Sequence, residues 1–522
     1  MGLVREILPR LVSLLVCPGF FYRTEYMKFI FNWKWELLSP LAGGLMTLSF
    51  APFNVWLLSL FSLVFAFYSW QGVSPGRALW RGFLYGVGLY GSGVHWVYVS
   101  IHDYGGAHYI GAGLLTAFFC LFWTIFPALT AYLTAKLENR QGVWGKVVLL
   151  PAIWILIDYV RGYLLLNGFP WLQVAYTQLD TPLAGYIPLL GSYGTGFILL
   201  LSAILLAETI RQRALWLRAS LILLLLWSGG FALSLIDWTE SRGKAIKVTL
   251  IQGNVAQDKK WLPEFRIKTL ISYQRLTEAH WDSDVVIWPE TAIPAFLHQV
   301  EDFYIEPLEA KARRHDTDLI VSLPAKGKSA KENYNMVLTL GKQRGEYKKN
   351  HLLPFGEYLP LQPLSGFVLE LLGVNLGNFV PGGNDQPLMV AGGYPFATSI
   401  CYEDAFSSVF LPALPEAAYL INVTNDAWFG DSLEPHQHMQ IARMRALETG
   451  RYLLRATNTG ITAFVDDKGK IIKQAPQFEQ ATLTDNIVPM SGMTPYARIG
   501  DKAIIFIFLV LSVTSLLVGK TK

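Results

Sequence analysis

Seven apolar runs occupy most of the chain between residues 36 and 236, and an eighth lies near its C-terminal end. They cover residues 37–50, 55–70, 83–101, 110–135, 147–160, 187–210, 215–236 and 503–518. The chain is 52% hydrophobic and 16% charged, with a mean hydropathy of +0.33, which is more apolar than a water-soluble protein. The first two runs are short and are joined by the turn APFN, so they predict a helical hairpin. The pattern therefore predicts a polytopic α-helical membrane domain with about eight spans.

The short segments between these runs alternate in charge. Lys and Arg occur before the first run, after the second, fourth and sixth runs, and in the tail: Arg5, Arg10, Arg23, Lys28 and Lys34; Arg77 and Arg81; Lys136, Arg140 and Lys146; Arg211, Arg213 and Arg218; Lys520 and Lys522. The loops APFN and HDYGGAH have neither residue type. Because basic loops stay in the cytoplasm, we expect both termini to be cytoplasmic and residues 240–500 to lie on the outer face of the membrane.

The first 35 residues surround an apolar run, 11–21, that is too short to cross roughly 30 Å of hydrocarbon. The sequence LLVC, which ends at Cys17, is compatible with the cleavage site of a lipoprotein signal peptide. However, Val16 is not the small residue that such cleavage needs, and Pro18 follows the cysteine. We interpret residues 1–35 as an uncleaved cytoplasmic or interfacial lead-in and assign it no function.

Charged residues gather between about 240 and 500, where strand and helix patterns alternate. Strands are predicted at 246–254, 285–290, 319–325, 334–341, 396–403 and 419–426, and helices at 263–280, 305–315 and 436–451. We expect an α/β fold with its active residues at strand ends. The predicted parts are the lead-in (1–35), a seven-helix transmembrane domain (36–238), the α/β domain (239–490), and a C-terminal transmembrane helix with its tail (491–522).

Two features of the apolar half carry polar or aromatic side chains. Asp158 and Arg161 are spaced as an i, i+3 pair near the outer end of the fifth run, and an ion pair between helices is the favoured interpretation. The segment 167–178, NGFPWLQVAYTQ, has aromatic residues suited to the lipid headgroup level. It fits either a structural belt or part of a lipid-facing groove.

Three loops of the α/β domain each offer one chemically useful side chain. Cys401 ends the β-like run YPFATSIC, Glu290 follows the run VVIWP, and Lys349 lies in YKKNHLLP. A cysteine is only a few per cent thiolate at neutral pH, so a nucleophilic cysteine needs a base. Glu290 suits that role because partial burial raises a carboxyl pKa toward the working range. Lys349 would stabilise an oxyanion, together with a backbone N–H after the cysteine.

Each of these residues also has a purely structural interpretation. Cys401 alone would be a small buried hydrophobic residue, Glu290 a surface carboxylate, and Lys349 a solvated charge beside Lys348. Only the three residues together favour catalysis. The other two cysteines, Cys17 and Cys120, lie outside the α/β domain, so that domain has no internal disulfide.

Several motifs of the chain resemble those of the nitrilase superfamily and, more closely, its membrane branch, the apolipoprotein N-acyltransferases. The motifs are PETAIP, HLLPFGEYLP, ICYE, NDAWFG, QHMQIARMRALE and TPYAR, with GSGVHWVYVSI and GFPWLQVAYTQ in the apolar half. The resemblance runs from about residue 41 to the C-terminus. It implies a nitrilase-like αββα sandwich on the extracytoplasmic side of the membrane domain. It also implies that Glu290 is the general base, Lys349 the stabilising lysine, Cys401 the nucleophile and Glu357 a supporting glutamate.

The resemblance suggests further supporting residues, each with an alternative. Tyr402 and Glu403 would shape the nucleophile turn, or cap the helix that follows. Trp261 is similar to a mobile-lid tryptophan that meets substrate, but an interfacial anchor is a fair rival. Asn335 would be an active-site residue or a strand-edge hydrogen-bonding group. Trp428 would be a core aromatic residue or a wall of an acyl pocket.

The reaction implied by the resemblance transfers the sn-1 acyl chain of a phospholipid, typically phosphatidylethanolamine, through a cysteine thioester. The acceptor is the α-amino group of diacylglyceryl-cysteine on an apolipoprotein, and the location is the inner membrane of a bacterium with the catalytic domain in the periplasm. We expect no metal or organic cofactor, because the His residues lack ligand spacing. We also expect a monomer that does not bind nucleic acid, since the net charge of +4 comes mostly from short loops.

Two other functions fit parts of the pattern. A membrane-tethered amidase would use the same three residues with water as acceptor, but it would not need seven spans and GFPWLQ. A transporter or scaffold with an inactive nitrilase-like domain would not need intact Glu290, Lys349 and Cys401, and the spans lack the buried charges of a carrier.

Overall fold

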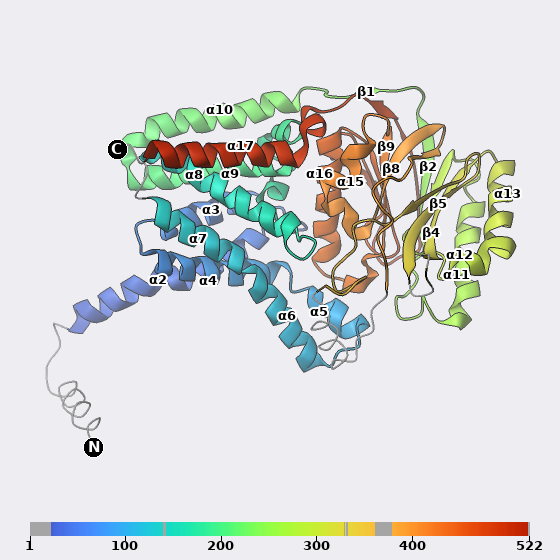
Figure 1. Cartoon of the computed structure of the whole chain (residues 1–522), viewed down its shortest axis with the longest axis horizontal. Coiled ribbons are helices and arrows are strands. Elements are labelled where there is room, and N and C mark those ends of the chain that lie inside the picture. Colours follow the sequence, from blue (N-terminus) through green and yellow to red (C-terminus); the bar gives the residue numbers. More distant parts are fainter. Residues whose placement is uncertain (1–21, 139–141, 328, 330–331, 361–377, 520–522) are drawn as a thin grey trace, which may run out of the picture.

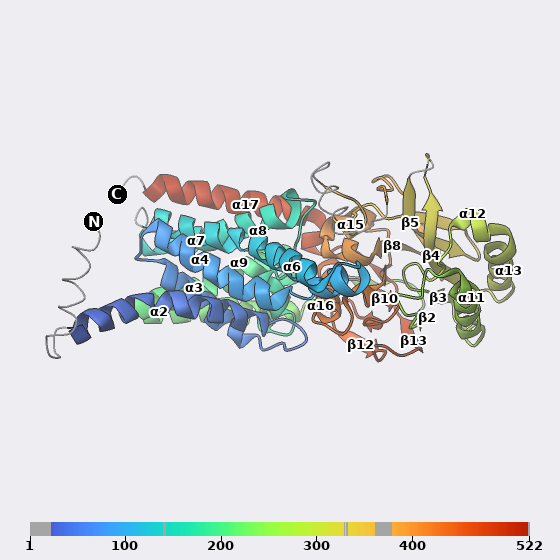
Figure 2. The ribbon, with the colours of Figure 1, turned by 90° about the horizontal axis from the view of Figure 1, so that it is seen from below.

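The computed structural model of the chain describes residues 22–138, 142–327, 329, 332–360 and 378–519. Helices α2 to α10, together with α17, form a helical domain at one end of the long axis, and the strands lie in a sheet domain at the other end (Figure 1). The start of α2 and the end of α17 both lie at the end of the helical domain that is farther from the sheets (Figures 1 and 2). The apolar run 11–21, Arg140, Lys520 and Lys522 lie outside the described residues.

The predicted apolar runs correspond to helices. Their bounds are α2 Tyr22–Thr47, α3 Leu57–Trp70, α4 Pro75–Gly93, α5 Val97–Val99, α6 Tyr109–Trp123, α7 Ile125–Glu138, α8 Val143–Tyr159, α9 Ile187–Arg211, α10 Trp216–Ser234 and α17 Pro495–Gly519. Within the described residues, five helical segments are long and apolar enough to cross a membrane: 109–138, 143–164, 182–211, 213–234 and 495–518. The count of eight spans and the sidedness stay predictions. Helix α2 begins before the first apolar run, so the predicted boundary at residue 35 lies inside it.

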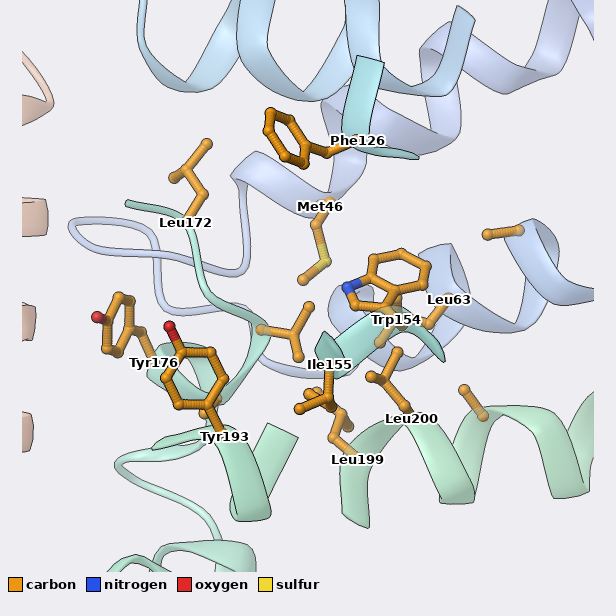
Figure 3. Packing of buried hydrophobic residues seen from close by; sticks show 14 of the residues in the cluster. Met46, Leu63, Phe126, Trp154, Ile155, Leu172, Tyr176, Tyr193, Leu199 and Leu200 are labelled. Carbon is orange, nitrogen blue, oxygen red and sulfur yellow. The ribbon is translucent and has the colours of Figure 1, made fainter. Parts of the chain in front are cut away.

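The helical domain has a continuous apolar core, to which helices and a loop both contribute. Figure 3 shows Met46 of α2, Leu63 of α3 and Trp154 of α8 packed together with Leu172 and Tyr176 of the segment 167–178. Both of these loop residues are buried. Its side chains thus help to fill the core beneath the sheet domain, and Leu172 and Val174 also line a cavity beside Asp158 and Arg161. A role as a headgroup-level belt or as part of a lipid-facing groove stays a prediction.

The sheet domain contains two six-stranded sheets within the described residues. The first has the order β13-β2-β3-β4-β5-β6, with bounds β13 Ala481–Ile487, β2 Ile246–Gln252, β3 Val285–Ile287, β4 Asp318–Lys326, β5 Asn333–Leu340 and β6 Gly345–Lys348. The second has the order β12-β11-β10-β9-β8-β7, with bounds β12 Ile471–Gln474, β11 Ala463–Val465, β10 Leu453–Thr457, β9 Tyr419–Thr424, β8 Tyr394–Ile400 and β7 Met389–Ala391. A short pair, β1 Glu240–Ser241 and β14 Met490–Ser491, closes the domain.

The two sheets pack face to face and helices cover their outer faces, which gives an αββα sandwich. On β3, Val285 and Ile287 point into the core between the sheets, while Val286 packs toward the outer helices. Those outer helices are α11 Pro263–Glu278, α12 Leu297–Val300 and α13 Glu306–Arg314 on the first sheet, and α15 Ser407–Phe410 and α16 Glu434–Thr449 on the second. Strands that are buried on both faces read as continuous apolar runs, which is why the sequence revealed them. The predicted αββα sandwich is confirmed.

Helix α16 joins the two domains because it is apolar on opposite sides. Met439 and Ala442 pack on the second sheet, whereas Ile441 and Met444 belong to the core of the helical domain. The sheet that carries β8 and β9 is thus the one placed against the helical domain (Figure 2).

Candidate active site

Cys401 lies directly after β8, at the carboxyl ends of the parallel strands β8 and β9. Its backbone has φ of +53°, a conformation that side chains with a Cβ rarely adopt. The turn ends the strand and begins the 3₁₀ helix Cys401–Ala405. Cys401 packs both against the core between the sheets and against the core of the helical domain. A nucleophile at this position can therefore be reached by a substrate that approaches along the helical domain.

Glu290 follows β3 of the other sheet and is 8% exposed. Its Oε1 accepts a hydrogen bond of 2.6 Å from Nδ2 of Asn335, a residue of β5. Among the described residues, no cationic nitrogen lies within 4.0 Å of the carboxylate, so it is not neutralised by a direct ion pair. Burial raises the pKa of Glu290, while the Lys349 cation opposes that rise. The arrangement suits a carboxylate that accepts a proton.

Lys349 follows β6 and is fully buried. Its ammonium lies 2.9 Å from the carboxylate of Glu357. That carboxylate also accepts a 2.8 Å hydrogen bond from the backbone N–H of Leu353. The backbone N–H of Lys349 donates to the carbonyl of Asn335 at 2.8 Å. Burial alone lowers the pKa of Lys349, but Glu357 and the other acidic groups outweigh burial and raise it. The lysine is thus a permanent cation held by Glu357 rather than by Glu290.

The structure brings Cys401, Glu290 and Lys349 together from different strand ends. Burial, followed by the charge of Glu290, raises the pKa of the Cys401 thiol to about 12, and Lys349 acts in the opposite direction. At rest the site therefore holds a neutral thiol beside Glu290 and the Lys349 cation. Such a thiol attacks a carbonyl only if a base removes its proton, and a cation beside the thiol can stabilise the oxyanion that then forms.

Glu403 and Tyr402 lie within the nucleophile turn and connect it to other segments. The carboxylate of Glu403 accepts hydrogen bonds from the backbone N–H groups of Ile400, Asn350 and His351 and from the hydroxyl of Tyr347, at 2.7 to 3.0 Å. Burial raises the pKa of Glu403 to about 7, against these backbone donors. Glu403 thereby ties the loop that carries Lys349 to the turn that carries Cys401.

Tyr402 points the other way, into the helical domain. Its hydroxyl donates to the carbonyl of Gly168 at 2.8 Å, and its ring stacks on Trp171 with centroids 6.2 Å apart. The predicted pair Asp158–Arg161 is present, and Arg161 also donates to the carbonyls of Phe169 and Trp171 at 2.6 Å. The buried ion pair therefore holds the loop on which Tyr402 rests.

Two predicted residues lie at the surface, away from these contacts. Trp261 precedes α11 and is 47% exposed, and Trp428 is 39% exposed with its ring edge against Tyr104 at 5.9 Å. Trp428 is thus not a core aromatic residue. Neither placement tests a contact with substrate.

A buried ionic cluster behind the nucleophile turn was not predicted from the sequence. We call it the ionic cluster: Asp404, Asp426, Glu434, His438 and Arg455. The two ring nitrogens of His438 face Asp404 at 2.8 Å and Asp426 at 3.1 Å, so the ring is doubly protonated.

Arg455, on β10, connects the ionic cluster to the nucleophile. It binds Asp404 at 3.0 Å and Asp426 at 3.2 Å, and also Oδ1 of Asn422 at 2.5 Å. Asn422 in turn donates to the carbonyl of Cys401 at 3.3 Å. The acidic residues after two strand ends, at 404 and 426, were the available signal, but β10 had not been predicted.

The atoms of Asp426, Glu434 and His438 also lie within 4.8 Å of one another, as metal ligands would. However, His438 and Asp426 already bind Asp404 and Arg455, and a second cation would be repelled by the guanidinium. We interpret the group as an ion-pair network.

Comparisons with known proteins identify the family. Residues 42–205 match the profile of the apolipoprotein N-acyltransferase N-terminal domain, and residues 247–496 match that of carbon-nitrogen hydrolase. The chain is 46% identical to apolipoprotein N-acyltransferase of Methylococcus capsulatus, covering 90% of this chain and 93% of that protein. It is 39% identical to apolipoprotein N-acyltransferase of Nitrosomonas europaea, covering 91% and 95%.

Among solved structures, Saccharomyces cerevisiae Nit3, a member of branch 10 of the nitrilase superfamily, aligns with a TM-score of 0.37 and 17% identity. The alignment covers 48% of this chain and 93% of Nit3. From the two profiles and the relatives that match over nearly its whole length, the chain belongs to the apolipoprotein N-acyltransferase family.

Proposed function

We propose that this chain transfers the sn-1 acyl chain of a phospholipid, such as phosphatidylethanolamine, to the α-amino group of diacylglyceryl-cysteine on apolipoproteins. The observation that carries the proposal is the position of Cys401, which packs against the cores of both domains. The family and the names of its members support the same reaction class. A single chain supplies the complete set of Glu290, Lys349 and Cys401, so we propose a monomeric enzyme.

A groove between the two domains supports a lipid substrate. Its volume is about 1090 Å³, and it is lined by α2, α4, α5 and α6 and by part of segment 431–436 of the sheet domain. Most of its lining is apolar, for example Leu48, Val87 and Leu121, with His436 and Asp431 at the sheet domain. Figure 1 shows α6 inclined away from the other helices on this side. An acyl chain among the helices with its polar end at the sheet domain matches this distribution.

In the first half-reaction, Sγ of Cys401 attacks the sn-1 ester carbonyl carbon while Glu290 accepts the thiol proton. Lys349 and the backbone N–H after Cys401 stabilise the tetrahedral oxyanion. The bond from the carbonyl carbon to the glycerol oxygen breaks, and the proton moves from Glu290 to that oxygen. The products are a lysophospholipid and a thioester on Cys401.

In the second half-reaction, the acceptor nitrogen attacks the thioester carbonyl and the carbon–sulfur bond breaks. One proton passes from the amine through Glu290 to the sulfur, which restores the thiol and leaves an amide. The apolar surroundings of Cys401 in both domains exclude water from the thioester.

We further propose that the enzyme resides in the bacterial inner membrane with the sheet domain in the periplasm and both termini in the cytoplasm. The start of α2 and the end of α17 lie at the same end of the helical domain, away from the sheets (Figure 1), which agrees with the charge pattern of the loops.

The deciding experiment is peptide mass spectrometry of the detergent-purified protein after incubation with phosphatidylethanolamine that carries a labelled sn-1 chain, without acceptor. We expect label on Cys401 that neutral hydroxylamine releases, and none in the Cys401→Ala variant. Absence of label on folded wild-type protein would contradict the proposal and favour a membrane-tethered amidase, which release of ammonia from small amides would reveal.

A further inference from the structure

Lys260 is a buried lysine whose ammonium contacts the turn that carries Glu290. It is 2% exposed, whereas its neighbours Lys259 and Trp261 are exposed. Lysine is almost never fully buried unless it is paired. Among the described residues, however, no carboxylate oxygen lies within 4.0 Å of its ammonium. The ammonium instead donates to the main-chain carbonyl of Glu290 at 3.1 Å and to Oγ1 of Thr291 at 2.6 Å.

The turn that Lys260 binds is conformationally unusual. Thr291 has φ of +46°, which is rare for a β-branched residue. On one side its backbone N–H donates to Oγ of Ser322 on β4 at 3.0 Å, and on the other side its hydroxyl accepts from Lys260. The orientation of Glu290 therefore depends on a strand neighbour and on a lysine from the segment before α11.

The charged groups that face Glu290 come from several elements. Lys349 and its partner Glu357 lie on the side of β6, the thiol of Cys401 lies on the second sheet, and Lys260 lies on the segment before α11. Burial lowers the pKa of Lys260 to about 8, and the charge of Glu290 opposes this change. Conversely, the cation of Lys260 lowers the pKa of Glu290. Since Lys349 is paired with Glu357, Lys260 is a separate source of positive charge for Glu290.

We propose that Lys260 is a positioning residue for Cys401 acylation: it holds the Glu290 turn in its strained form and keeps the carboxylate ready to accept the thiol proton. The role assigned to Glu290 rests on the proposed function. Because Trp261 follows Lys260, the same contacts also fix where that tryptophan leaves the sheet domain.

The test compares Lys260→Met with Lys259→Met, a substitution at the exposed neighbouring lysine. Two rates are measured against pH in the full-length protein: single-turnover labelling of Cys401 by the phospholipid, and alkylation of Cys401 by iodoacetamide. We expect Lys260→Met to slow the first rate about 10- to 100-fold, the effect of losing hydrogen bonds to a charged group. Loss of the cation raises the pKa of Glu290, so the rise of both rates with pH should move to higher pH. Lys259→Met should behave as wild type.

Thr291→Val separates orientation from charge, because it removes the acceptor hydroxyl but keeps the cation and the β-branched side chain. It should slow acylation without moving the pH profile. Lys260→Arg keeps the charge, so it should stay near the wild-type profile, and it serves if Lys260→Met does not fold.

A folded Lys260→Met variant with the wild-type rate and profile would overturn the inference, as would a shifted profile in Lys260→Arg. If the wild type takes no label from phospholipid, the proposed function fails, but the iodoacetamide profiles still test Lys260 alone.

Discussion

The turn that carries Cys401 and the turn beside Glu290 both hold a residue other than glycine at positive φ, yet their surroundings differ. Conformations of this kind cost about 1 to 3 kcal/mol each, so each turn needs contacts that stabilise it. The Cys401 turn has the carboxylate of Glu403 and, through Asn422, the ionic cluster. The Glu290 turn is held by Lys260 and by the hydroxyl of Ser322, and the carboxylate of Glu290 accepts from Asn335.

The difference follows from what each sheet faces. The sheet with β8 and β9 lies against the helical domain, so its turn is enclosed and its polar groups must pair with one another. The sheet with β3 is covered by α11, α12 and α13, whose outer sides are exposed. We infer that substitutions around the nucleophile turn act mainly on stability, whereas substitutions around the base turn act mainly on the rate of acylation. Four substitutions test this inference, in order of decreasing expected effect.

Glu290→Gln should slow labelling of Cys401 by phospholipid about 10²- to 10⁴-fold, the usual contribution of a general base. The amide keeps an oxygen that accepts from Asn335, so the fold and the melting temperature should stay near wild type. Single-turnover labelling and thermal unfolding give the two readouts. A near-normal labelling rate would remove Glu290 from its proposed role.

Arg455→Met should instead act on stability. It leaves the buried carboxylates of Asp404 and Asp426 without their guanidinium partner, and breaking a buried ion pair in this way costs about 3 to 5 kcal/mol. Denaturant unfolding of the detergent-solubilised protein measures the change.

Lys342→Met is the matched control, since Lys342 and Asp316 form an exposed pair at 3.0 Å in the same domain. It should change the free energy of unfolding by about 1 kcal/mol or less. Equal effects of the two substitutions would show that the ionic cluster does not brace the nucleophile turn.

The same contrast explains how far the sequence alone could lead. Strands β3, β8 and β9 were predictable because both of their faces are buried, and Glu290 and Cys401 were recognisable because each follows such a run. Lys349 instead follows the short, polar strand β6, so only its motif pointed to it. The sequence did not predict β6, β7 or β10 to β13. Strands β6, β12 and β13 have exposed or mixed patterns that resemble loops, β7 and β11 have only three residues each, and β10 is interrupted by the buried Arg455. The partners of Arg455 and Lys260 could not be predicted, because each contact joins segments that only the tertiary fold brings together.

Gln437→Leu tests whether the nucleophile turn depends on the helical domain. Oε1 of Gln437 accepts from the indole of Trp171 at 2.7 Å, and Trp171 stacks on Tyr402. Trp96 also donates to Gln437, but it keeps a second acceptor in the carbonyl of Gly93. The variant therefore leaves one buried donor unpaired, which costs about 1 to 3 kcal/mol.

Gln440→Leu, in the same helix, is the control for Gln437→Leu, because its hydrogen bonds to Ala51 and Asn54 are long, at 3.3 and 3.4 Å. Thermal unfolding and the labelling rate of Cys401 should both change more in Gln437→Leu. The reverse order would mean that α16 and the segment 167–178 do not support the turn.

Trp261→Ala should have the smallest effect on stability and tests the segment before α11, on the side of the base turn. Trp261 is 47% exposed, and surface substitutions usually change the free energy of unfolding by no more than about 0.5 kcal/mol. If Trp261 meets substrate, the variant should need more phospholipid for half-maximal labelling while it melts like wild type. Phe303→Ala removes a somewhat more exposed aromatic side chain, 59% exposed, from the outer layer of the same domain and should change neither quantity. A lower melting temperature in Trp261→Ala with unchanged phospholipid dependence would make the segment before α11 a structural anchor, and the surroundings of the base turn would then act on stability as those of the nucleophile turn do.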